Sequence, residues 1–147
     1  SSTLWLANGV QFFTNIGWAF LILSLPDYLK TVKNMDDRDS GMITTLALTI
    51  GIAALPVGGM MTDTITRRFG RRLGRMIPLS VTKFVAAGGY LAALQMESSW
   101  GMAVAFGCVA FFADIGLPAM WTTLQDISGR HQAQLFGWSN MWGNFGA

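Results

Sequence analysis

The chain has 147 residues, of which 52% are apolar and only 12% carry a charge, with a net charge of +2. A soluble domain usually carries about 25% charged residues, so this composition disfavours a soluble protein and predicts a membrane chain. The single Cys108 excludes an internal disulfide and a cysteine metal cluster. The positive charge gathers in five arginines between residues 67 and 75, which leaves no basic face for nucleic acid.

Five stretches are long and apolar enough for membrane-spanning helices, which need about 20 mainly apolar residues. Each stretch is apolar on most sides, whereas a helix of a soluble protein is usually apolar on one face. The sequence therefore predicts an all-α, polytopic transmembrane bundle. Because the chain starts without Met and ends within an apolar pattern, we expect it to be a piece of a longer protein. The predicted spans cover residues 4–29, 42–62, 76–96, 100–124 and 132–147, the last one truncated.

Four short polar segments join the predicted spans, and their positive charges are unevenly distributed. Segments 64–75 and 125–132 together carry six arginines, whereas the other two segments carry only Lys30, Lys33 and Arg38. Lys and Arg in short loops favour the cytoplasmic side of a membrane. We therefore expect the segments 64–75 and 125–132 to be cytoplasmic loops.

Amide side chains occur within the first and the last predicted spans. Asn8, Gln11 and Asn15 are three and four residues apart, which places them on one face of the first helix. Asn140 and Asn144 form a similar pair on the fifth. Polar side chains in a membrane helix usually face a protein interior or a wet cavity. These amides therefore either line a substrate cavity or form hydrogen bonds between packed helices.

Asp114 is the only carboxylate deep within a predicted span. It is either a proton or cation site or a structural carboxylate paired with a neighbouring polar group. The structural interpretation is favoured because no cation lies in an adjacent turn of the same helix. Lys83 lies about two turns inside the third span, and we expect its long side chain to extend to the cytoplasmic interface.

Pro118 lacks an amide hydrogen and is expected to bend the fourth helix. The bend would turn Trp121 and Thr122 toward a central cavity, where they offer a stacking surface and a hydroxyl group. The alternative is a tryptophan at the membrane interface. The lone His131 has no Ser or Cys partner placed for a catalytic triad. The sequence therefore predicts no enzyme, no metal site and no cofactor.

The segment between the second and third spans resembles a cytoplasmic loop motif of the major facilitator superfamily. In that motif a Gly is followed four residues later by an Asp, and then by Gly-Arg-Arg/Lys. Gly59 and Asp63 match the first part, and Gly70, Arg71 and Arg72 match the second part. The interval between the two parts is longer than in the usual first-half loop and is similar to the loop between helices eight and nine.

The flanking helices resemble the anion:cation symporter branch of this superfamily. Residues 17–20 and 25–29 look like its seventh helix, with Asp27 where the branch has Thr, and residues 121–144 look like its tenth and eleventh helices. The resemblance implies that residues 1–147 form part of a C-terminal six-helix half, from helix seven to helix eleven of twelve. The N-terminal half of the same protein would then be its missing partner.

The resemblance also implies a function. Members of this branch are secondary active transporters of organic anions, in bacteria often hexuronates or aldonates, commonly moved together with protons across the inner membrane. Two halves rock around a site near the middle of the bilayer. A transporter of another class, for sugars or for drug efflux, and a non-transporting membrane sensor on the same fold are the alternatives.

Carried over by position, the resemblance predicts two groups of functional residues, and Asp114 stays a candidate coupling residue. Amides suit the first group because each one both donates and accepts hydrogen bonds. The predicted substrate contacts are Gln11, Asn15, Trp121, Thr122, Asn140 and Asn144. One Asp at a helix end beside several arginines suggests a conformational latch, made of Gly59, Asp63, Arg67, Arg68, Gly70, Arg71 and Arg72.

Overall fold

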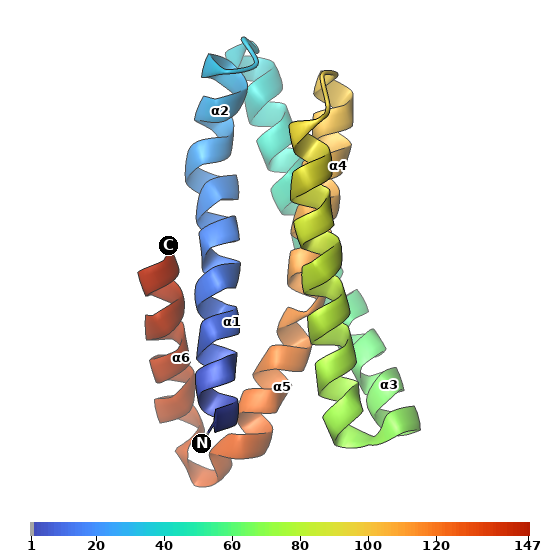
Figure 1. Ribbon diagram of the computed structural model, residues 1–147, viewed down its shortest axis with the longest axis vertical. Coiled ribbons are helices and arrows are strands. Elements are labelled where there is room, and N and C mark those ends of the chain that lie inside the picture. The colour runs from blue at the N-terminus through green and yellow to red at the C-terminus, as the bar shows by residue number, and fades with distance from the viewer. Residues whose placement is uncertain (1) are drawn as a thin grey trace.

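The structure, a computed structural model, describes residues 2–147 apart from the side chain of Ser99. It is 92% helical, without a strand in the described part of the chain, which confirms the all-α prediction. The elements are α1 (Ser2–Ala19), the π-helical η1 (Phe20–Ser24), α2 (Leu25–Thr31), α3 (Asp37–Leu94), α4 (Ser99–Ile115), α5 (Leu117–Ser128), the 3-10 turn η2 (Gly129–His131) and α6 (Gln132–Gly146) (Figure 1).

Three continuous helical stretches are long and apolar enough to cross a membrane, namely Ser2–Thr31, Asp37–Leu94 and Trp100–Gly146. At 1.5 Å per residue, the second would measure about 87 Å if it were straight. It instead folds back on itself near its middle, and the third stretch folds back at η2 (Figure 1). The five predicted spans lie within these three stretches except for residues 95, 96 and 147, and their crossing of a membrane stays a prediction.

Much of the outer surface of the bundle is apolar. Phe84 is 80% exposed, and Phe13 and Met60 are each 72% exposed. Contiguous exposed apolar surface on a soluble protein would promote aggregation, whereas it is favourable in contact with lipid tails. The surface therefore agrees with the membrane class predicted from composition.

The segment 64–75, predicted to be a loop, is almost entirely helical. Only Gly70 leaves the helical conformation, with a φ of 82° that glycine adopts without steric cost. The flanking arginines have high helix propensity, so both arms of α3 extend to this turn. We call residues 37–69 the first arm and residues 71–94 the second arm. Segment 125–132 is also mostly helical, because α5 continues to Ser128 and α6 begins at Gln132.

The turns of the chain lie at two opposite ends of the bundle. The N-terminus, the turn at Gly70 and η2 are at the lower end of Figure 1, and the connections 32–36 and 95–98 are at the upper end. Segments 64–75 and 125–132, which carry six arginines, therefore share one end, as expected from their charges. The assignment of that end to the cytoplasm stays a prediction.

Two prolines mark irregular points of the helices. Pro26 lies within the first helical stretch, because η1 widens the preceding turn and α2 continues to Thr31. The hydroxyl of Ser40 donates a hydrogen bond of 3.0 Å to the carbonyl oxygen of Pro26. Pro118 lies at the start of α5, where a missing amide hydrogen is tolerated. The break itself is at Gly116, between α4 and α5.

Close packing of α3 against α4 holds the centre of the bundle. Ala54 and Gly58 are buried on the first arm, and a Cβ atom added at Gly58 would overlap the carbonyl oxygen of Ile115. Gly59, one residue further, has open space around its Cα atom. Small residues thus allow the two helix backbones to approach closely at this point.

We predict that Gly58→Ala destabilises the protein by about 1–3 kcal/mol, because its methyl group would overpack the contact with Ile115. Gly59→Ala is the matched control, since it adds the same methyl group to the same helix without meeting a neighbour. The measurement is the midpoint temperature of unfolding of the purified protein in detergent. Equal midpoints for the two variants would contradict the close approach of α3 and α4.

Candidate functional site

A cavity of about 330 Å³ lies between α1, α5 and α6. It brings together three of the six predicted substrate contacts, one from each helix: Gln11, Trp121 and Asn140. We call it the amide cavity. Its complete lining consists of Gln11, Met120, Trp121, Leu124, Phe136, Gly137, Ser139 and Asn140.

The hydrogen-bonding capacity of the amide cavity is only partly used within the described residues. The side-chain oxygen of Gln11 is buried and has no hydrogen-bond partner, while its nitrogen donates a 3.5 Å hydrogen bond to Asn15. Asn140 is exposed, and Trp121 is 46% exposed. A buried acceptor without a partner costs free energy until it meets a donor. The cavity can therefore bind a small polar molecule through two amides and an indole ring.

Gly143 brings α6 close enough to α1 to form this cavity. A Cβ atom at Gly143 would lie 2.8 Å from Cγ of Gln11 and 2.9 Å from the amide nitrogen of Asn15. Any larger residue would push α6 away from α1 or displace the Gln11 side chain. The glycine therefore fixes the separation of two of the three walls.

The other three predicted contacts lie outside the amide cavity. Asn15 borders a separate hollow beside Trp18 and is linked to the cavity only through Gln11. The Thr122 hydroxyl donates to the carbonyl oxygens of Pro118 and Ala119, at 2.7 and 3.1 Å. Its proton is therefore already used in hydrogen bonds within its own helix. Asn144 is exposed and does not line the cavity. One turn of α6 separates it from Asn140, which explains why spacing alone grouped them.

Asn8 is a packing residue. It is buried, and its side-chain oxygen accepts a 2.6 Å hydrogen bond from the hydroxyl of Ser139 on α6. Of the two interpretations of the amide face on α1, hydrogen bonding between helices therefore describes Asn8. Gln11, one turn further along, faces the amide cavity instead.

The predicted latch residues other than Gly59 are exposed at or near the Gly70 turn, whereas Gly59 is half-buried further along the first arm. Within the described part of the chain, neither Asp63 nor the arginines 67, 68, 71 and 72 make an ion pair. The pair found there joins Arg75 to Asp126, with Nε 3.2 Å from Oδ2, and so ties the second arm of α3 to α5. Sequence reasoning missed this pair because the two residues are 51 positions apart.

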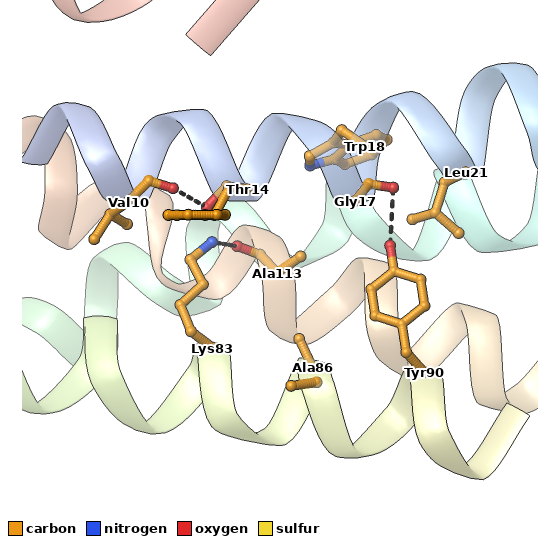
Figure 2. A pocket seen from close by; sticks show the side chains of 11 residues that line it. Val10, Thr14, Gly17, Trp18, Leu21, Lys83, Ala86, Tyr90 and Ala113 are labelled. Atoms are coloured by element: carbon orange, nitrogen blue, oxygen red, sulfur yellow. Dashed lines mark hydrogen bonds between the residues drawn. The ribbon is translucent and has the colours of Figure 1, made fainter. Parts of the chain in front are cut away.

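A second group of polar side chains lies in the middle of the bundle (Figure 2). The indole Nε1 of Trp18 donates to Oδ1 of Asp114 at 3.0 Å, which is the kind of partner that the structural interpretation of Asp114 required. Lys83 donates to the carbonyl oxygen of Ala113 at 2.9 Å, and Tyr90 donates to that of Gly17 at 2.8 Å. The expectation that Lys83 extends to the membrane interface is therefore wrong, because a backbone oxygen inside the bundle binds its ammonium group.

Lys83, Trp18 and Tyr90 border a cavity of about 360 Å³ whose remaining lining is largely apolar. It lies between α1 and the second arm of α3. Among the described residues, no group of three or more His, Cys, Asp or Glu could hold a metal ion. The amide cavity is the place where three of the six predicted substrate contacts converge.

Comparison with known proteins relates the chain to a transporter. It is 28% identical over 144 residues to a protein of Cupriavidus necator described as a probable sulfoacetate transporter. The match covers 93% of this chain and 32% of the relative, so the chain spans about a third of the relative's length. No family model matches the chain, and no solved structure matches it. The similarity agrees with the expectation of a transport protein in preference to an enzyme.

Proposed function

We propose that the chain is part of a secondary active transporter of small organic anions, in the anion:cation symporter branch of the major facilitator superfamily. The similarity to the probable sulfoacetate transporter over 93% of the chain supports the transport assignment. The superfamily and its branch rest on the resemblance of the motifs around Gly59, Asp63 and Gly70. Sulfoacetate and the hexuronates suggested by the sequence motifs share one chemistry, that of a small and strongly hydrated anion. We place the protein in the inner membrane of a bacterium, with the Gly70 turn and η2 in the cytoplasm.

The amide cavity is proposed as this chain's side of the substrate site. Its amides can bind hydroxyl groups and anion oxygens, because each side chain both donates and accepts hydrogen bonds. Its lining contains no Lys or Arg. The charge of the anion would then be compensated by the N-terminal half, where the branch has its carboxylate-binding arginine and its proton-coupling acids.

Transport would follow alternating access, in which the two halves rock around the substrate site. The exposed Asp63 and the neighbouring arginines would bind the other half in one state and release it in the next.

We expect Asp63→Asn to slow turnover without changing the unfolding temperature. Asp39→Asn, also exposed but near the other end of the first arm, is the control. Unchanged turnover of Asp63→Asn would count against the latch.

Uptake by the full-length protein in proteoliposomes tests the proposed function. We predict gradient-driven accumulation of at least one labelled anion among sulfoacetate, glucuronate, galacturonate and galactonate when an inward proton gradient is imposed. The same vesicles without a gradient provide the control. Absence of uptake for all four anions in a folded preparation would contradict the assignment and favour another substrate class or a sensor.

We predict that Gln11→Ala raises the half-saturation concentration of the transported anion about 3- to 10-fold, the equivalent of one lost hydrogen bond of about 1 kcal/mol. Asn144→Ala is the matched control, because it removes an exposed amide outside the amide cavity. Initial uptake rates measured over a range of anion concentrations give the half-saturation concentration of each variant. Equal half-saturation concentrations for the two variants would remove Gln11 from the site.

A further inference from the structure

Trp18, Lys83 and Asp114 meet in the middle of the bundle, from α1, the second arm of α3 and the last turn of α4. We call these three residues the polar junction. Two hydrogen bonds hold it together, from Trp18 to Asp114 at 3.0 Å and from Lys83 to the carbonyl oxygen next to Asp114 at 2.9 Å. Asp114 is only 5% exposed. The junction therefore brings two opposite charges into the interior of an apolar bundle.

The two charges lie at similar depth. Lys83 is near the middle of the second arm, and Asp114 is near the middle of the stretch formed by α4 and α5. A single charge at the centre of a membrane bundle is costly, and charged side chains there usually pair with one another or with backbone carbonyls. The first arm also approaches the carboxylate, because a Cβ atom at Gly51 would lie 3.0 Å from its second oxygen.

Lys83 binds the C-terminal end of α4, where the regular hydrogen bonding of that helix ends. The carbonyl groups in the last turn of α4 lack regular helical partners, and a cation is favourable at this end of a helix. Lys83 binds one of these carbonyl groups, that of Ala113, just before the break at Gly116. Asp114 is held from the other side by Trp18 on α1. Contacts of both charged residues therefore flank the point at which α5 leaves α4.

We propose that Lys83 and Asp114 form a compensating charge pair that fixes the α4–α5 break, and that both are positioning residues for Trp121 in the amide cavity. Trp121 lies in the second turn of α5, so a change in the direction of α5 moves its ring relative to Gln11 and Asn140. The inference rests on the proposed function only in assigning Trp121 to the substrate site.

The first test measures the direction of α5 without transport. Spin labels on Leu91→Cys and Gln125→Cys, in a Cys108→Ser background, report the distance between the second arm and α5 in the full-length protein. Lys83→Met should shift or broaden this distance, because it leaves the Asp114 carboxylate uncompensated. The double variant Lys83→Met with Asp114→Asn removes both charges and should return the distance toward that of the parent protein.

Lys33→Met is the matched control, since Lys33 also donates to a backbone carbonyl, that of Met96 at 3.0 Å, but near the upper end of the bundle. It should leave the distance unchanged. If Lys83→Met does not fold while the double variant does, the compensating pair is supported equally. A double variant as disturbed as Lys83→Met, or an undisturbed Lys83→Met, would overturn the proposal.

The second test measures anion uptake with the same variants. Lys83→Met should raise the half-saturation concentration about tenfold, with partial recovery in the double variant, as expected when a lone buried charge is the cause. If Asp114→Asn abolishes the dependence on the proton gradient while Lys83→Met has no effect, Asp114 is a coupling residue and the proposal is overturned. The spin-label distances decide the positioning role even if none of the tested anions is transported.

Discussion

The carboxylate of Asp114 lies where α1, both arms of α3 and the end of α4 approach one another, and it cannot stay there without partners. Asp114 is only 5% exposed, so its charge requires hydrogen-bond donors and a nearby cation. Trp18 supplies a donor, and Lys83 supplies the cation while binding the adjacent carbonyl group. These contacts join three helical segments that are distant in sequence, and the amide cavity lies between α1, α5 and α6.

The need to satisfy backbone hydrogen bonds explains the form of the connections between the helices. In lipid, helices satisfy their own backbone hydrogen bonds, and the chain continues its helices through most of segments 64–75 and 125–132, which its polar residues suggested to be loops. One glycine at residue 70 is enough to reverse α3, and one 3-10 turn joins α5 to α6. The arginines near Gly70 consequently project from helix ends and are exposed, as a contact with another part of the transporter would require.

The sequence predicted the helical class, because apolar length and helical spacing depend on local residues alone. The resemblance grouped Gln11, Trp121 and Asn140 as candidate substrate contacts, and the structure places all three along one cavity. Thr122 and Asn144 lie outside this cavity, since spacing does not reveal that a hydroxyl is bound to its own helix or that an amide faces outward. The partners of Asp114 and Asp126 could not be predicted, because they depend on how distant helices pack.

Binding of a small anion in the amide cavity during transport is tested most directly by substrate protection of a cysteine placed at that site. The measurement uses Asn140→Cys in a Cys108→Ser background, with the rate of alkylation followed in membranes. We predict that the transported anion slows alkylation of Asn140→Cys but leaves alkylation of Phe145→Cys unchanged. Phe145 is exposed on the same helix and lies outside the cavity. Equal alkylation rates of Asn140→Cys with and without saturating anion would contradict binding in the amide cavity.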